Sequence, residues 1–201
     1  MKKLVFCIVF VLLAVSACDI KLSSTISVSD LLSPTNKIVL SDLMFEVSSC
    51  SETDLQKVIE EINRKNISAK YNKCQSDGFS DYAVFSIPLT IVKNKDGIQK
   101  ENVVYLSVND KKVYLHTSSA IDWLLLSDEG KSKIKEISFN LVNDTEQPLK
   151  VNLQYVFVDG KPILSQAIEL AQYSKTNIQL SDVAVKQVET PNTTFQIMEF
   201  E

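Results

Sequence analysis

Residues 139–163 read FNLVNDTEQPLKVNLQYVFVDGKPI, and this stretch decides how the second half of the chain is interpreted. Apolar and polar residues alternate in it with a period of two, as they do along a strand that buries one face. Asn143-Asp144-Thr145 and Asp159-Gly160-Lys161-Pro162 interrupt the alternation with residue types that favour turns. The face expected to be buried consists of Phe139, Leu141, Val151, Leu153, Tyr155 and Phe157.

The alternation continues toward the C-terminus, for example at Ile178 and Leu180 and again at Phe195 and Ile197. Short strands separated by turn signals about every 8–12 residues are typical of antiparallel sandwiches. Residues 131–201 are therefore predicted to form a small antiparallel β-sandwich.

Residues 37–130 mix helix and strand signals. The clearest helix follows Ser51, a favourable N-cap, and carries an apolar stripe at Leu55, Val58, Ile59 and Ile62. Strands are expected at 37–48 and 82–93, where Pro88 indicates an edge or a bulge, and in a hairpin around Asn109-Asp110-Lys111-Lys112, with a short helix through Trp123 after it.

The predicted fold class is therefore α+β: a strand-helix-strands unit over residues 37–130, followed by the sandwich. The domain boundary is expected between Gly130 and Lys135. Because no long linker separates the halves, one composite body is the alternative.

Composition excludes several kinds of site. The chain has 201 residues and a formal net charge of −4, with four glycines, one histidine and four cysteines. These residues are too few for glycine-rich phosphate loops, histidine metal sites or cysteine-rich zinc modules. A chain with a net negative charge also lacks the surplus of cations that displaces counterions from nucleic acid. We therefore expect no metal, no cofactor and no nucleic-acid partner.

The N-terminus has the layout of a signal peptide over residues 1–17. Lys2 and Lys3 precede an apolar run that is too short for a stable membrane span, and small residues follow it. Val15-Ser16-Ala17-Cys18 resembles the lipobox of bacterial lipoproteins. That resemblance implies cleavage between Ala17 and Cys18 and a diacylglycerol on the Cys18 sulfur. The alternative is a secretory signal cut after Ala17 that leaves Cys18 as a free thiol.

The residues after Cys18 suggest where the protein resides. Asp19 resembles the inner-membrane retention signal of enterobacterial lipoproteins, with the outer membrane as the alternative. Residues 18–36 are rich in serine and threonine and are expected to form the anchor and a flexible tether. The alternative there is a short helical turn at 29–32 packed on the body.

The cysteines that remain after maturation predict one disulfide. Cys7 leaves with the signal peptide and Cys18 is assigned to lipid, so only Cys50 and Cys74 are available to pair. Closing this loop of about 25 residues stabilises a fold by roughly 3.5 kcal/mol in the chain-entropy model. A redox or nucleophilic thiol is the alternative, although neither cysteine belongs to a Cys-x-x-Cys pair.

Candidate catalytic groups are sparse. Glu60 and Glu61 are adjacent on the predicted helix and point about 100° apart, so they are expected to lie on a solvated face rather than to form a glycosidase pair. Asp42, His116 and a serine form a conceivable triad, but no Gly-x-Ser-x-Gly elbow supports it. We expect an exposed or hydrogen-bonded strand position for His116 and a core position for Trp123.

Two further resemblances concern the body. Residues 139–163 resemble immunoglobulin-like modules. The anchored cysteine, the serine-rich start, the FEVSSC segment and the DGKP turn together resemble a family of small lipoproteins in enterobacterial genomes and prophages. That resemblance implies no reaction. We therefore expect a non-enzymatic, lipid-anchored binding module whose partner is an envelope or phage protein, and which blocks superinfection if a prophage encodes it. A cell-wall hydrolase and a carrier of an apolar ligand are the alternatives.

Overall fold

The computed structural model describes residues 19–64, 68–93, 103–118, 121, 126–127, 130–131 and 133–201. The expected signal peptide, the cleavage site at Ala17, the lipidation site at Cys18 and the helix around Trp123 lie outside these residues. In the described part of the chain, no helix is long and apolar enough to cross a membrane.

Most of the described residues belong to strands. These are β1 (Asp19–Ser27), β2 (Lys37–Val47), β3 (Lys70–Asp77), β4 (Ser80–Val92), β5 (Val104–Asn109), β6 (Lys112–Thr117), β7 (Leu126–Ser127), β8 (Gly130–Lys131), β9 (Lys133–Val142), β10 (Leu149–Val158), β11 (Lys161–Leu170), β12 (Lys175–Leu180) and β13 (Thr194–Phe200). Three helices are described, namely α1 (Val28–Leu32), α2 (Glu52–Arg64) and α4 (Asp182–Val188).

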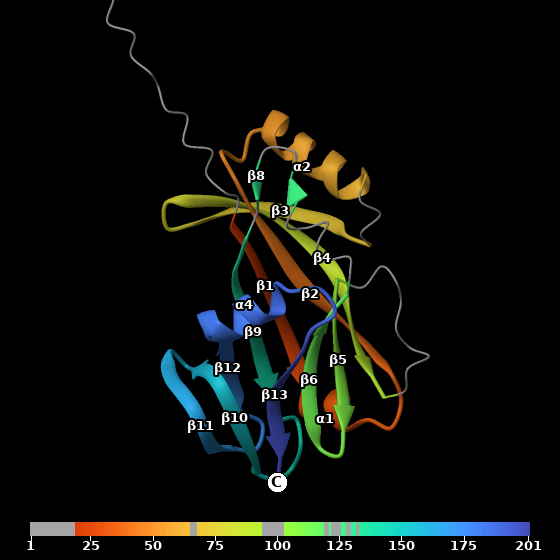
Figure 1. Cartoon of the computed structure of the whole chain (residues 1–201), viewed down its shortest axis with the longest axis vertical. Helices are drawn as coiled ribbons and strands as arrows, with labels where there is room; N and C mark the ends of the chain where they lie inside the picture. Colours follow the sequence, from red (N-terminus) through yellow and green to blue (C-terminus); the bar gives the residue numbers. More distant parts are fainter. Residues whose placement is uncertain are drawn as a thin grey trace, which may run out of the picture.

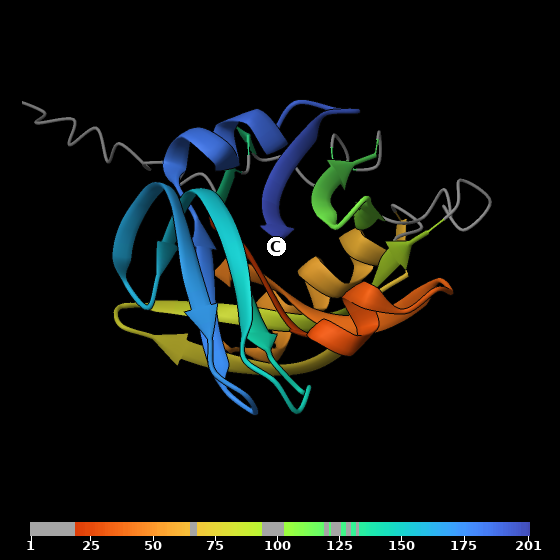
Figure 2. The ribbon, with the colours of Figure 1, turned by 90° about the horizontal axis from the view of Figure 1, so that it is seen from below.

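Nine of the strands form a closed barrel (Figures 1 and 2). Around the ring the order is β10, β12, β9, β1, β2, β4, β5, β6 and β13, and β13 pairs with β10 to close it. β3 and β11 lie outside the ring and pair with β4 and β10, respectively, while β7 and β8 form a separate two-stranded sheet. Two of the ring's neighbouring pairs, β1 with β9 and β4 with β5, are parallel.

The α+β prediction with an immunoglobulin-like sandwich is wrong, because both halves of the chain contribute to one closed barrel. β9, from the second half, lies beside β1 at the N-terminus, and β13 lies beside β6. Alternation correctly indicated strands, but it reports only that a face is buried and not which strand lies alongside.

Residues 19–36, expected to be a tether, instead contain β1 and α1. The side chains of Ile20, Leu22 and Ile26 point into the barrel and are nearly inaccessible to solvent. The serine-rich outer positions concealed this period of two. Ser27 caps α1, as its hydroxyl accepts a hydrogen bond from the Asp30 N–H at 3.1 Å, and Val28 and Leu31 of the helix are buried.

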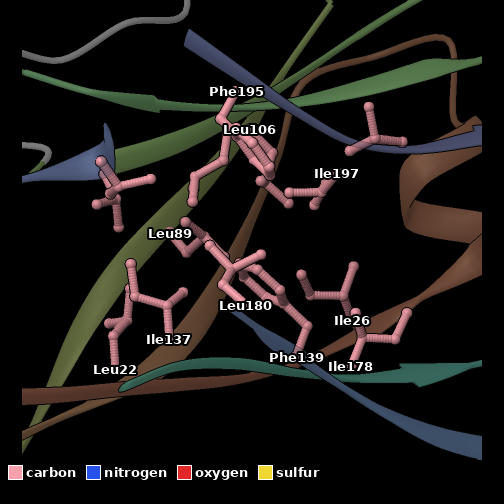
Figure 3. Close-up of a cluster of buried hydrophobic side chains, with 14 of the residues drawn as sticks. Leu22, Ile26, Leu89, Leu106, Ile137, Phe139, Ile178, Leu180, Phe195 and Ile197 are labelled. Carbon is pink, nitrogen blue, oxygen red and sulfur yellow. The ribbon is translucent and has the colours of Figure 1, made fainter. Parts of the chain in front are cut away.

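The barrel interior is filled with side chains from all nine strands of the ring (Figure 3). Leu22 and Ile26 of β1 belong to the same core cluster as Phe139 of β9, Leu106 of β5 and Ile197 of β13. Toward the start of β1, a cavity of about 10 Å³ has a lining of aliphatic side chains that includes Ile20, Leu43 and Ile137. Such a volume is comparable to a single water molecule.

β4 changes partner partway along one edge. β2 runs along its other edge from residue 81 to residue 91. The shared edge pairs with β3 up to Ser86 and with β5 from Thr90 onward. Pro88 lies in the interval between them, where neither β3 nor β5 pairs with this edge of β4, and proline is tolerated at such unpaired edge positions because it has no N–H to donate. Pro88 therefore marks neither an edge strand nor a bulge of β4 against β2, but the point at which the neighbour changes.

β10 also changes partner partway along one edge. β11 pairs along one edge from Leu149 to Val158. The other edge must therefore accept both β13, opposite residues 151–153, and β12, opposite residues 156–158. Between these segments Tyr155 has a φ of 54°, in the left-handed region.

The left-handed residue also shifts the alternation of β10. Val151, Leu153 and Val156 are buried, whereas Tyr155 is 49% exposed. The expectation that Tyr155 lies on the buried face is therefore wrong. The helix α4 joins β12 to β13. It contacts both strands and also β6, β9 and β10, so it packs against the part of the barrel where these five strands come together.

Candidate functional site

Two groups of polar side chains on the outside of the barrel have functional interest. The first surrounds the start of β1. We call it the β1 cluster, and it consists of Asp19, Lys21, Glu46, Asp77, Ser80, Lys133 and Lys135. It is notable because Asp19 directly follows Cys18, the predicted lipidation site.

Asp19 has a structural role in this cluster. Its carboxylate lies 2.8 Å from the Lys135 ammonium and 3.7 Å from that of Lys133, and the residue is only 9% exposed. The hydrogen bond to Asp19 is the largest influence on the Lys135 ammonium and raises its pKa. The carboxylate thus holds β9 against β1, a use that is independent of any sorting signal.

Lys21 connects β1 to the turn between β3 and β4. Its ammonium lies 2.5 Å from an Asp77 carboxylate oxygen and 4.5 Å from the centre of the Tyr82 ring. Burial opposes the charge of Lys21, but the hydrogen bond to Asp77 and the contact with Tyr82 outweigh it and raise the pKa. The same hydrogen bond lowers the pKa of Asp77. Both groups are therefore charged at neutral pH.

Glu46 joins the start of β1 to the same turn. One of its carboxylate oxygens accepts a hydrogen bond from the Asp19 backbone N–H at 3.3 Å, and the other accepts one from the Ser80 hydroxyl at 2.5 Å. A single side chain of β2 therefore fixes the first residue of β1 relative to the β3–β4 hairpin.

Cys50 and Cys74, the pair that the sequence predicts, form a disulfide with a Cα–Cα distance of 5.7 Å. The bond joins the segment before α2 to β3, the strand outside the barrel. As predicted, Ser51 begins the helix, because its hydroxyl accepts a hydrogen bond from the Asp54 N–H at 3.3 Å. α2 lies at the end of the molecule away from the C-terminus (Figure 1), where Ile62 is buried and Leu55, Val58 and Ile59 are half-buried.

The second group surrounds His116 on the outer face of β5, β6 and β13. We call it the His116 face, and it consists of Tyr105, Ser107, Tyr114, His116 and Thr194. Ring nitrogen Nε2 of His116 lies 2.7 Å from the Ser107 hydroxyl, and Nδ1 lies 3.0 Å from the Thr194 hydroxyl. The imidazole stacks on Tyr105, with ring centres 4.7 Å apart and planes inclined by 3°.

The contact between Ser107 and His116 has the geometry of a nucleophile and a base, but the third member differs from that of a hydrolase triad. A carboxylate normally orients the imidazole and stabilises its positive form. Here a neutral threonine hydroxyl occupies that place, and burial lowers the pKa of His116. The imidazole is therefore poorly suited to hold the proton taken from serine.

The carboxylates singled out by sequence do not complete this group. Asp42 lies on β2, three strands away from β6 in the ring, a separation of about 14 Å at the usual spacing of strands. Glu60 and Glu61 lie on α2, where Glu60 accepts a hydrogen bond from Gln56 at 3.1 Å. Among the described residues, no cluster of three or more histidine, cysteine, aspartate or glutamate side chains is arranged to hold a metal ion.

Sequence reasoning missed several members of both groups. The pairing of Tyr105 with His116 follows from the predicted hairpin, because its two-residue turn at Asp110-Lys111 sets the register. Thr194 carries no such signal, since β13 and β6 pair although they are distant in sequence. Glu46 was missed for another reason: it lies beside the start of β1, a strand that the sequence analysis took for a tether.

Neither the comparison with curated proteins nor the comparison with solved structures gave a match. One family model matches residues 20–201, a range that covers nearly all of the barrel, the β3–β4 hairpin and α2. Since this match spans most of the sequence, the chain belongs to DUF7424, a domain of unknown function.

Proposed function

We propose that the protein is a lipid-anchored component of the bacterial cell envelope, held by acyl chains on Cys18, and that its barrel binds a partner without catalysing a reaction. The Cys50–Cys74 disulfide is the observation that carries the location. Disulfides persist in oxidising compartments and are rare in the cytosol. The layout of residues 1–18 supplies the route to such a compartment.

The start of β1 supports close contact with the membrane. Asp19 is already paired with β9, so no flexible segment separates Cys18 from the barrel. Two or three acyl chains anchor a protein far more firmly than one chain does. The barrel is therefore held at the bilayer surface instead of extending from it on a tether.

The His116 face supports binding over catalysis. It combines two tyrosines, an imidazole and hydroxyl groups on the outer surface of three paired strands. Aromatic and polar groups of this kind are common in recognition surfaces. The filled barrel interior also favours this proposal over a carrier that encloses an apolar ligand.

Replacing the anchoring cysteine tests the proposal. Cys18→Ser is expected to move the full-length protein out of the membrane fraction, because the acyl chains have lost their attachment point. Cys7→Ser is the matched control, since that cysteine lies within the predicted signal peptide and is not acylated. Mass spectrometry of the mature N-terminal peptide should show diacylglycerol on Cys18. A bare thiol, or a Cys18→Ser protein that stays with membranes, would contradict the anchor.

Blocking entry of a second phage is the specific role proposed for this protein if a prophage encodes it. Cells that express the intact protein should then resist some phages of a broad panel at the step of DNA entry. Cys18→Ser should restore sensitivity, and Tyr114→Ala tests whether the His116 face is the surface involved. Unchanged adsorption and DNA entry across the panel would eliminate this role while leaving the anchor in place.

A further inference from the structure

The turn between β3 and β4 displays the most exposed large hydrophobic side chain among the described residues. Phe79 has a relative exposure of 112%, above the reference value for an open side chain. Asp77 pairs with Ser80, which leaves Gly78 and Phe79 as a two-residue turn. Gly78 has a φ of 64°, as expected for the first central residue of a type II′ hairpin turn. The turn therefore presents Phe79 at its tip.

Phe79 stands on a fixed support. Asp77, on one side of the turn, bonds to Lys21 of β1, and Ser80, on the other side, bonds to Glu46 of β2. Both flanks of the turn are thus tied to the wall of the barrel. A side chain presented in this way loses little conformational freedom when it is buried by another surface.

The fixed turn lies close to the proposed anchor. Glu46, which binds Ser80, also accepts a hydrogen bond from the backbone N–H of Asp19, the residue after Cys18. Lys21, which binds Asp77, is three residues beyond Cys18, or roughly 10 Å along an extended strand. The acyl chains on Cys18 would therefore leave the protein beside the turn that carries Phe79.

The charged side chains of the β1 cluster balance one another. Asp19 is matched by Lys133 and Lys135, and Asp77 is matched by Lys21. With Glu46 included, the β1 cluster has three acidic and three basic side chains. A surface without net charge can approach a lipid bilayer without depending on anionic headgroups.

We infer that Phe79 inserts into the bilayer beside the acyl chains of Cys18 and holds the barrel in one orientation on the membrane. This inference rests on the proposed lipidation of Cys18. Aromatic side chains are favourable at the boundary between headgroups and acyl chains, and binding there scales with the apolar area buried. Lipid at Cys18 fixes one point of the protein, and Phe79 supplies a second.

The test uses a tryptophan as a depth probe. The full-length, lipidated Phe79→Trp protein is placed in vesicles of phosphatidylethanolamine and phosphatidylglycerol with brominated acyl chains, which quench tryptophan emission on contact. The matched control is Leu164→Trp, at a 77% exposed residue of β11. Quenching of the added emission is obtained by comparison with the unsubstituted protein, which contains one tryptophan. Flotation of the vesicles measures attachment separately.

We expect both variants to float with the vesicles, the Phe79→Trp emission to be lost, and the Leu164→Trp emission to persist. Flotation without quenching at residue 79 would overturn the inference and leave the anchor standing, and Phe79 would then contact a protein or remain in solvent. Quenching at both residues would also overturn it, because the barrel would have no fixed orientation. Failure of the unsubstituted lipidated protein to float would overturn the proposed anchor itself.

Discussion

β4 and β10 both change partner along one edge, but the residue at the point of change differs between the two strands. Each strand has one edge that is shared between two successive partners: β3 and then β5 on β4, and β13 and then β12 on β10. On β4 the change takes place at Pro88, which lacks a backbone donor. On β10 it takes place at Tyr155, which adopts a left-handed φ of 54°.

The difference shows why one change of partner is visible in sequence and the other is not. Proline has no backbone N–H, so its presence in a strand predicts a position where a ladder hydrogen bond is missing. Tyrosine has no preference for left-handed backbone, and that conformation costs an ordinary residue about 1–2 kcal/mol. Only the surrounding strands impose it. Such strain persists where the rest of the structure determines the local geometry, and here it allows one strand to close the ring.

The largest expected effect comes from the core side chains next to each change of partner. Leu89 and Leu153 are both 0% exposed. Leu89→Ala and Leu153→Ala should each lower the free energy of unfolding by about 2–5 kcal/mol, because each leaves a cavity in one shared core. Urea unfolding of the Cys18→Ser protein would measure this. A much smaller cost at Leu153 would indicate that β10 folds as a separate unit.

Removal of the disulfide is expected to have the next largest effect on stability. The largest local change should occur in α2 and in β3, the strand that pairs with β4 outside the ring. Replacing both Cys50 and Cys74 with serine should lower the free energy of unfolding by up to about 3.5 kcal/mol. Amide hydrogen exchange should become faster in α2 and β3, because the covalent link between them is gone, and should change less in β9. Equal acceleration throughout would show that α2 and β3 do not open independently of the barrel.

Tyr155 provides a smaller and opposite effect. Tyr155→Gly should raise the free energy of unfolding by about 0.5–1 kcal/mol. Glycine avoids the steric cost of a positive φ, and this gain is larger than the conformational entropy that glycine loses on folding. Tyr155→Val should lower it by about 1 kcal/mol or more, because branching at Cβ disfavours this backbone. Pro88→Ala is the matched substitution on β4 and should change stability by less than about 1 kcal/mol. Thermal unfolding would rank the three variants.

The smallest expected effect concerns His116 on β6, the strand that lies between β5 and β13 in the ring. Burial lowers its pKa below the ordinary value of 6.5. As pH falls through 6.5, the unfolded state binds the proton first, so the stabilising contribution present above this pH is lost toward the lowered pKa. His116→Gln should remove this part of the pH dependence, and unfolding curves on either side of pH 6.5 would reveal it. An unchanged profile in the variant would contradict the shift.

Much of the local structure could be predicted from the sequence, because it depends on neighbouring residues. Ser51 and the apolar stripe from Leu55 to Ile62 predicted α2, and Asn109-Asp110-Lys111-Lys112 predicted the β5–β6 hairpin. β1 was missed, since serines on its outer face resemble a linker in composition although Ile20, Leu22 and Ile26 alternate correctly.

The candidate sites, like the strands, divide into those that the sequence predicted and those that only the tertiary structure revealed. By counting cysteines the sequence alone determined that Cys50 would pair with Cys74, and through residues 1–18 it determined the prediction of a lipid anchor. Tertiary structure alone decided that β1 lies between β2 and β9, that Glu46 joins Asp19 to the turn carrying Phe79, and that Thr194 meets His116. The physical reason is that residue type and period record whether a side chain is buried, whereas the choice of neighbour depends on the packing of the whole chain.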